Sequence, residues 1–118
     1  MQQRTILVSL LAATLAFGFG TASAKGTAAA GKTKAAACEA CHGTDGDGIA
    51  PNYPALAGQY QDYIAQMLHE YKGGQRTNAI MNGMASPLSD QDIDDLAAYF
   101  SSLPSKLSDL HGKVNGGD

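Results

Sequence analysis

A chain of 118 residues with a formal net charge of −3 has room for one small domain, and its acidity argues against nucleic acid as a partner. The apolar residues recur with helical periods throughout and show no strand pattern, so we expect an all-α fold.

Residues 1–24 have the three parts of a secretory signal peptide. Arg4 gives a positive charge, residues 6–19 form an apolar run of 14, and the small residues ending at Ala24 form a cleavage motif. An uncleaved membrane anchor is the alternative, but this run is shorter than the roughly 18 to 20 residues that span a bilayer. We therefore expect cleavage after Ala24, export to the periplasm without an integral anchor, and a mature chain of 94 residues with a formal charge of −4.

The alanine-rich residues 27–37 favour a helix whose small side chains let another helix approach closely. It should run into Cys38-Glu39-Ala40-Cys41-His42, which has the spacing of a c-type haem attachment site. Each thiol can bond to one haem vinyl group, and the histidine directly behind them can supply a nitrogen to the iron. We predict that Cys38 and Cys41 attach one haem c covalently and that His42 binds its iron, as in a protein that moves electrons.

Two other readings of the motif are weaker. A redox-active disulfide between Cys38 and Cys41 would be expected in a chain with strands and helices. A structural zinc site needs four ligands, and only His69 and His111 remain, far apart in the sequence.

A turn-forming segment, residues 43–48, follows the motif, and the prolines of residues 50–54 favour extended backbone. Asp45 and Asp47 could suggest calcium, but the later ligands of a calcium-binding loop are missing, which favours a solvated turn.

Residues 59–72 predict an amphipathic helix ended by two glycines. Its apolar stripe consists of Tyr60, Tyr63, Ile64, Met67, Leu68 and Tyr71. Met67 should belong to the core. His69 lies beside the stripe, so we expect a partly exposed residue, with a role as an alternative iron ligand left open.

Residues 75–88 have little periodicity and contain Asn82-Gly83, so they predict a loop. Ser89 with Asp92 then resembles a capping box. The helix that follows should bury Ile93, Leu96, Ala97 and Phe100 and stop at Pro104, before a loose tail over residues 104–118. Its acids Asp90, Asp92, Asp94 and Asp95 suit the positive end of a helix, with docking of a basic partner as a second hypothesis.

These motifs together resemble a bacterial class I cytochrome c of the c-four and c-five-fifty-three branch. The resemblance covers nearly all of residues 28–103, and its motifs occur in the family's order. They are the haem-attachment motif, residues 50–58, residues 81–84 and residues 88–100. The c-four proteins carry two haem domains, whereas this chain has a single attachment motif, so we expect a monohaem protein with a cytochrome domain over residues 25–103.

The resemblance implies a class I cytochrome c fold, in which crossed N- and C-terminal helices enclose the haem between the attachment segment and a methionine-bearing loop. It implies that Met81, not Met84, is the second axial ligand, and that the carbonyl of Pro51 accepts a hydrogen bond from the proximal histidine. The turn expected at Asn82-Gly83 would point the two methionines in different directions. Further haem contacts are expected from Tyr53, Leu56, Ile80 and Arg76, the last toward a propionate.

A six-coordinate His/Met iron leaves no open position for substrate, which indicates a diffusible electron carrier and not an enzyme. We expect this carrier to be a monomer. Its expected partners are redox proteins such as membrane-bound reductase or oxidase complexes. Two alternatives stay open: a haem enzyme or gas sensor with five-coordinate iron, and a tightly bound subunit of a larger oxidase or dehydrogenase.

Overall fold

The computed structural model describes residues 25–106, so the predicted signal peptide and most of the predicted tail lie outside the described residues. Within this range the chain forms five helices and no strand: α1 (Ala28–Lys34), α2 (Ala36–His42), α3 (Gln61–Gly73), α4 (Ala79–Ala85) and α5 (Asp90–Ser102). The prediction of an all-α fold is confirmed.

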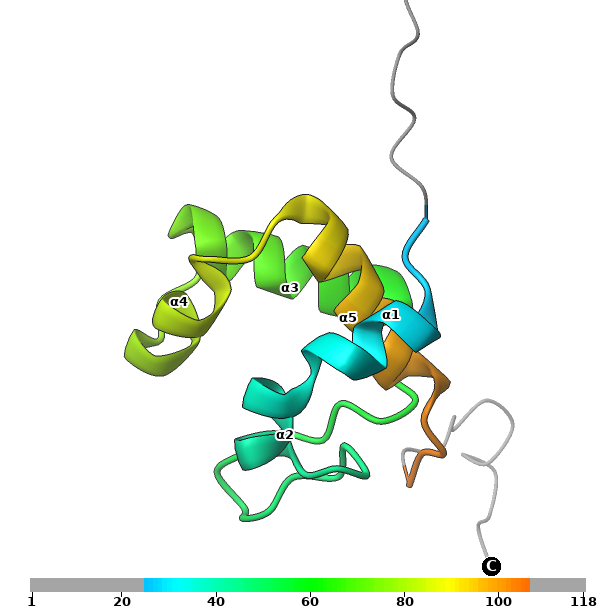
Figure 1. Ribbon diagram of the computed structural model, residues 1–118. Helices are drawn as coiled ribbons and strands as arrows, with labels where there is room; N and C mark the ends of the chain where they lie inside the picture. Colours follow the sequence, from blue (N-terminus) through cyan, green and yellow to red (C-terminus); the bar gives the residue numbers. More distant parts are fainter. Residues whose placement is uncertain (1–24, 107–118) are drawn as a thin grey trace, which may run out of the picture.

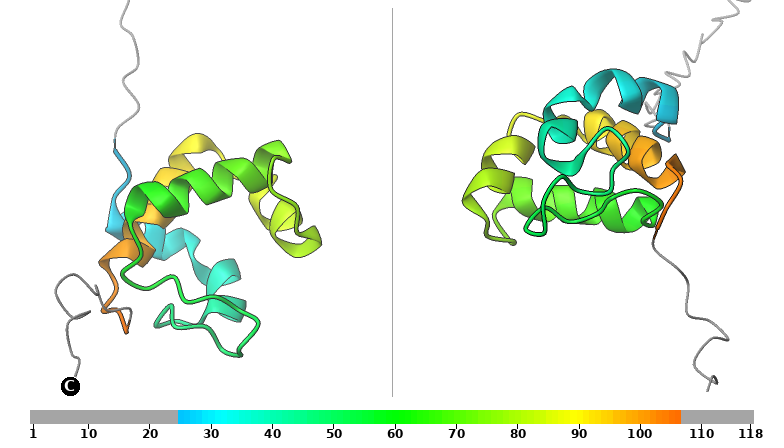
Figure 2. Two further views of the ribbon diagram at one scale, coloured as in Figure 1. Left: turned by 180° about the vertical axis from the view of Figure 1, so that it is seen from behind. Right: turned by 90° about the horizontal axis from the view of Figure 1, so that it is seen from below.

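Helices α1 and α5, far apart in the sequence, cross and pack against each other (Figures 1 and 2). Gly31 makes this approach close, because a Cβ atom built there would overlap the Asp95 carbonyl oxygen and lie 2.6 Å from the Tyr99 Cβ atom. The expectation that small residues in the first helix let another helix approach is therefore confirmed.

The core is centred on α5 and shared with α1 and α3. Its buried residues are Ala35, Ile64, Leu96, Ala97, Tyr99 and Phe100. All four residues of the predicted apolar face of α5 are buried. The predicted capping box is also present, since the Ser89 hydroxyl accepts from the Asp92 N–H and the Asp92 carboxylate accepts from the Ser89 N–H. The helix starts where the capping pattern predicts because the box satisfies amides that have no partner within the helix.

Helix α3 buries only part of its predicted stripe. Ile64 is buried and Leu68 packs against the core, whereas Tyr60 and Tyr63 are 71% and 46% exposed. The amphipathic helix is present as predicted and packs against α5, but the tyrosines at the start of its apolar stripe stay in solvent.

Residues 75–88 were predicted as a loop, but the structure forms α4 within them. The side chain of Asn78 accepts hydrogen bonds from the N–H groups of Ile80 and Met81 and so caps the helix. Asn82 and Gly83 consequently lie inside a helix and not in a tight turn. A helix of seven residues is too short to show a clear period, which is why the pattern missed it.

Candidate cofactor site

Helix α2 presents the two thiols. Cys38 and Cys41 are three residues apart in one helix, which puts them on the same face, and both are free and partly buried. Burial, and then the charges of Glu39 and Cys41, raise the pKa of the Cys38 thiol. A thiol held in its neutral form lacks the lowered pKa of redox-active Cys-x-x-Cys proteins, which argues against the disulfide reading.

His42 closes α2 with a buried imidazole, 7% exposed. Its Nδ1 atom lies 2.8 Å from the carbonyl oxygen of Pro54. A carbonyl oxygen only accepts, so Nδ1 is the donor and carries the proton, which leaves the lone pair of Nε2 free to bind a metal. The prediction that Pro51 supplies this carbonyl was wrong: Pro51 lies in the same loop, but the chain turns back so that the later proline reaches the ring.

The loop after α2 is folded tightly enough to hold that carbonyl in place. The carbonyl oxygen of Gly46 accepts from the N–H groups of Leu56 and Ala57, and the Gly48 N–H donates to the His42 carbonyl oxygen. Gly48 has a φ of +81°, and a Cβ atom there would overlap the Tyr53 carbonyl oxygen, so only glycine fits. The loop therefore acts as a rigid support for the histidine.

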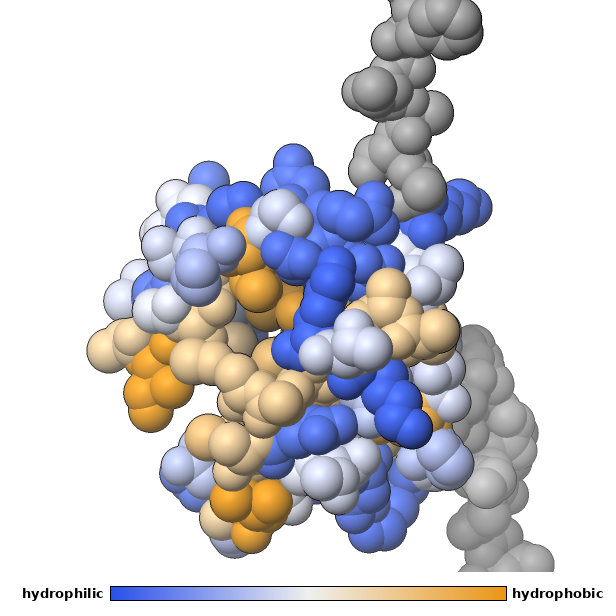
Figure 3. Space-filling model, in the orientation of Figure 1, coloured by the Kyte–Doolittle hydropathy of each residue, from blue (hydrophilic) through white to orange (hydrophobic). Residues whose placement is uncertain are grey.

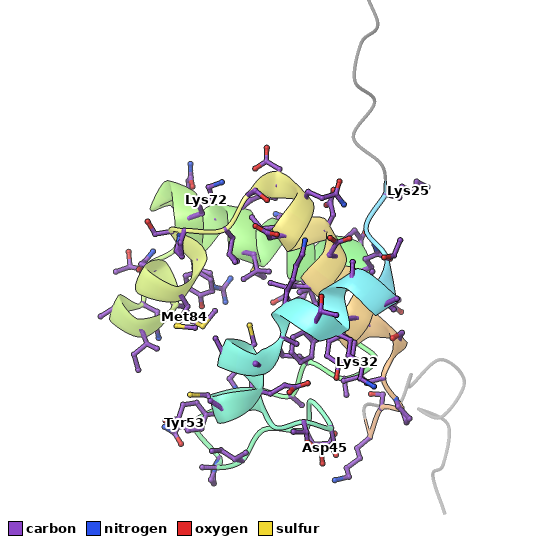
Figure 4. The ribbon with its side chains drawn as sticks, in the orientation of Figure 1. Lys25, Lys32, Asp45, Tyr53, Lys72 and Met84 are labelled. Atoms are coloured by element: carbon purple, nitrogen blue, oxygen red, sulfur yellow. The ribbon has the colours of Figure 1, made fainter. Side chains whose placement is uncertain are left out.

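Helix α4 lies on the opposite side of the site. Met81 and Met84 are three residues apart within it and so share a face, which corrects the expectation that a turn points them in different directions. Met81 is partly buried and Met84 is 36% exposed. Met84 lies on the side of α4 that faces α2, and Tyr53 lies on the other side of the intervening space (Figure 4). The surface is hollowed between these two parts, with hydrophobic residues on both rims (Figure 3).

The other predicted haem contacts are more scattered. Tyr53 is partly buried in the loop after α2, Leu56 packs against the core, and Ile80 is 62% exposed on α4. No described contact tests their role toward a haem.

Arg76 and Met67 bind each other. The Arg76 guanidinium donates to the Met67 sulfur at 2.7 Å and to the Tyr71 hydroxyl at 3.0 Å, and it stacks over the Tyr71 ring. Met67 therefore uses its sulfur within α3 and the turn after it. His69 is exposed as predicted, with its Nδ1 atom 3.9 Å from a carboxylate oxygen of Asp90.

The acids at the start of α5 are largely paired within the molecule. Lys34 lies 2.7 Å from Asp92 and 2.6 Å from Asp95, and Asp95 is buried. Asp90 lies 3.5 Å from Lys72. Asp95 cannot belong to a docking surface, because its carboxylate holds α1 against α5.

Sequence reasoning missed three contributors to the site region. The Pro54 carbonyl carried no signal that separates it from the neighbouring proline. The N-cap role of Asn78 did have a sequence signal, since asparagine is a favoured N-cap residue and the apolar Ile80 follows it. The hydrogen bond of 2.8 Å from the Tyr99 hydroxyl to Glu39 joins α5 to the attachment motif and depends on the tertiary fold alone.

These residues fit a haem. Two free thiols share one helix face, a buried imidazole keeps Nε2 available, and a methionine-bearing helix faces them across an apolar hollow. Among residues 25–106, no three histidine, cysteine, aspartate or glutamate side chains gather as they would around a zinc or calcium ion. No helix in that same range is long and apolar enough to cross a membrane.

Comparisons with known proteins agree with this assignment. The family model described as Cytochrome c matches residues 28–104. The chain is 53% identical over 98 residues to cytochrome c4 of Pseudomonas aeruginosa, an alignment that covers 82% of this chain and 47% of the relative. It is 52% identical over 80 residues to cytochrome c-554(548) of Halomonas halodenitrificans, covering 65% of this chain and 96% of that protein.

Among solved structures, the fold is similar to that of reduced recombinant cytochrome c4 from Pseudomonas stutzeri, with a TM-score of 0.64 and 48% identity. The match covers 67% of this chain and 46% of that structure. The chain thus spans about half the length of the cytochrome c4 relatives it matches.

Proposed function

Since this chain belongs to the cytochrome c family, in its class I fold and cytochrome c4 branch, we propose that it is a periplasmic electron-transfer protein with one covalently bound haem and with His42 and Met81 as axial ligands. The observation that carries the proposal is the buried imidazole of His42, whose Nδ1 atom is bound to a carbonyl while two free thiols lie on the same helix. A haem held there supplies a one-electron couple between ferric and ferrous iron.

The residues of the chain have separate tasks in this proposal. The thiols of Cys38 and Cys41 hold the group covalently, so it cannot dissociate. The hydrogen bond from Nδ1 of His42 to the Pro54 carbonyl fixes the ring orientation and makes Nε2 a stronger base. Met81 contributes a thioether, which favours the ferrous state and so raises the reduction potential.

Ligation from both sides by the chain's own residues favours a carrier over an enzyme, because it leaves no position for substrate. The expected partners are redox proteins that give or take one electron. Export rests on the signal-peptide pattern of residues 1–24, and a single haem rests on the single attachment motif.

Intact mass tests the covalent attachment. After treatment with acid and organic solvent, the mass should equal residues 25–118 plus one haem, because thioether bonds survive extraction. Cys38→Ala or Cys41→Ala should leave one attachment point and lower the yield of holoprotein. A mass with a disulfide and no haem would overturn the proposal.

The ferric absorption spectrum tests the second ligand, because a sulfur-to-iron charge-transfer band near the red end reports a bound methionine. Met81→Ala should abolish this band, open the position to added ligands and lower the potential. Met84→Ala, on the same face of α4, is the matched control and should keep the band. The reverse pattern would show that Met84 is the ligand, and a wild-type protein without the band would favour a five-coordinate haem enzyme or sensor.

A further inference from the structure

The side-chain amide of Asn82 joins α4 to the end of α3 through its nitrogen and binds the N-cap residue of α4 through its oxygen. The Nδ2 group donates to the carbonyl oxygens of Tyr71 at 2.6 Å and Arg76 at 2.8 Å. The Oδ1 atom accepts from the N–H of Asn78 at 2.7 Å. The orientation of the amide is unambiguous, because two of its partners only accept and the third only donates.

These bonds reach backbone groups at the end of α3 and at the start of α4. Tyr71 lies in the last turn of α3, where its carbonyl oxygen also accepts a longer bond of 3.3 Å from the Gly74 N–H, and Asn78 is the N-cap residue of α4. One side chain therefore caps the end of one helix and the start of the next, and it also holds the Arg76 carbonyl of the turn between them.

The position of α4 depends on this link. Within residues 25–106, α4 packs against α3 and against no other helix. Asn82 directly follows Met81, so its side chain leaves the helix about 100° around the axis from that methionine. Holding the amide against α3 therefore sets the rotation of α4 about its own axis, which decides where the methionine face points.

We propose that Asn82 is a positioning residue that holds the methionine face of α4 toward the haem iron by clamping α4 to the end of α3. This inference rests on the proposed function, since it concerns the strength of the methionine ligand. Loss of the clamp lets α4 rotate or fray, which weakens the bond between sulfur and ferric iron without removing the sulfur.

The test is a competition for the sixth position in the ferric holoprotein. Added imidazole displaces the methionine, and the loss of the sulfur-to-iron band measures its apparent affinity. Asn82→Ala should raise that affinity roughly tenfold or more, because three hydrogen bonds that hold the ligand helix are lost. Asn82→Asp has nearly the same shape and keeps an acceptor for Asn78, but it loses both donors toward Tyr71 and Arg76. If the hydrogen bonds of Asn82, and not its packing, hold α4 in place, Asn82→Asp should raise the imidazole affinity about as much as Asn82→Ala does.

Thr27→Ala is the matched control, because Thr27 also caps a seven-residue helix, accepting from the Ala30 N–H at the start of α1. It should lower the overall stability while leaving the imidazole affinity unchanged. Hydrogen exchange gives a second readout: the Ile80 and Met81 amides should exchange faster in Asn82→Ala and not in Thr27→Ala.

An Asn82→Ala protein with wild-type imidazole affinity and wild-type exchange in α4 would overturn the inference. Equal effects of Thr27→Ala and Asn82→Ala would also overturn it, because they would reflect general stability. A Met81→Ala protein that keeps the band would refute only the assignment of Met81 as the ligand. Because α4 also carries Met84, the imidazole titration of Asn82→Ala would still test whether Asn82 positions the methionine face of α4.

Discussion

The two glycines inside the short helices α1 and α4 should respond in opposite directions to the same substitution. Alanine is the better helix former by about 1 kcal/mol, so Gly→Ala in a helix with free space should stabilise the protein. A Cβ atom at Gly83 meets nothing within 4 Å, whereas one at Gly31 overlaps the backbone of Asp95 and the Cβ atom of Tyr99.

The clash at Gly31 involves backbone, so α1 and α5 must move apart to relieve it. Overpacking of this kind costs about 3 kcal/mol, which exceeds the gain in helix propensity and leaves Gly31→Ala destabilised by about 2 kcal/mol. For a domain of this size, that loss lowers the melting temperature by roughly 8 to 16 °C. Gly83→Ala should be stabilised by up to about 1 kcal/mol.

Thermal and denaturant unfolding of the two holoproteins, followed by helical circular dichroism, measures both changes. A Gly31→Ala protein as stable as Gly83→Ala would refute the close contact between α1 and α5 and, with it, the argument for glycine in the first helix.

Two further predictions follow from shifted pKa values. Hydrogen bonds from Lys34, and then from the Thr27 N–H, hold the pKa of Asp95 below its ordinary value, so the stability this carboxylate contributes should be present above about pH 4 and lost as the pH falls further. In Lys34→Met, the denaturant midpoint should fall less between about pH 7 and about pH 3 than it does in the wild type. An equal fall of the midpoint in both proteins would contradict the assignment. The hydrogen bond to Glu39, and then burial, raise the pKa of Tyr99, so its contribution should be present below about pH 10 and lost as the pH rises through the folded-state pKa. Tyr99→Phe should lose stability at neutral pH and remove this alkaline decline, and an alkaline midpoint identical to wild type would count against it.

Local signals predicted the elements that depend on local chemistry. The helical structure leading into the attachment motif, the capping box at Ser89 and the buried face of α5 each depend on residues within about one or two helical turns. The wrong predictions concern choices that only tertiary contacts make. Nothing in the sequence separates Pro51 from Pro54 as the partner of His42, because the answer depends on how the loop turns back.

Helix α4 was missed for a related reason. Asn82-Gly83 favours a turn when considered alone, but the Asn82 amide is bound to the end of α3, and Asn78 caps the new helix. Tyr60 and Tyr63 are exposed although they belong to the apolar stripe. A helical period shows which residues share a face of the helix, but it does not show how much of that face the neighbouring helices cover. The iron-ligand assignments stay predictions, supported by the arrangement of α2 and α4.

The peripheral attachment of α4 has a consequence for how such proteins diverge. In the described part of the chain, α4 packs against no helix but α3, whereas Cys38 of α2 packs against the core that α1, α3 and α5 share. Residues 75–88 can therefore be exchanged with the same segment of a relative with little repacking of the frame, provided that the buried Ala85 and Leu88, which packs against the core, are kept. Grafting that segment between homologues would offer a way to vary the reduction potential over one unchanged scaffold.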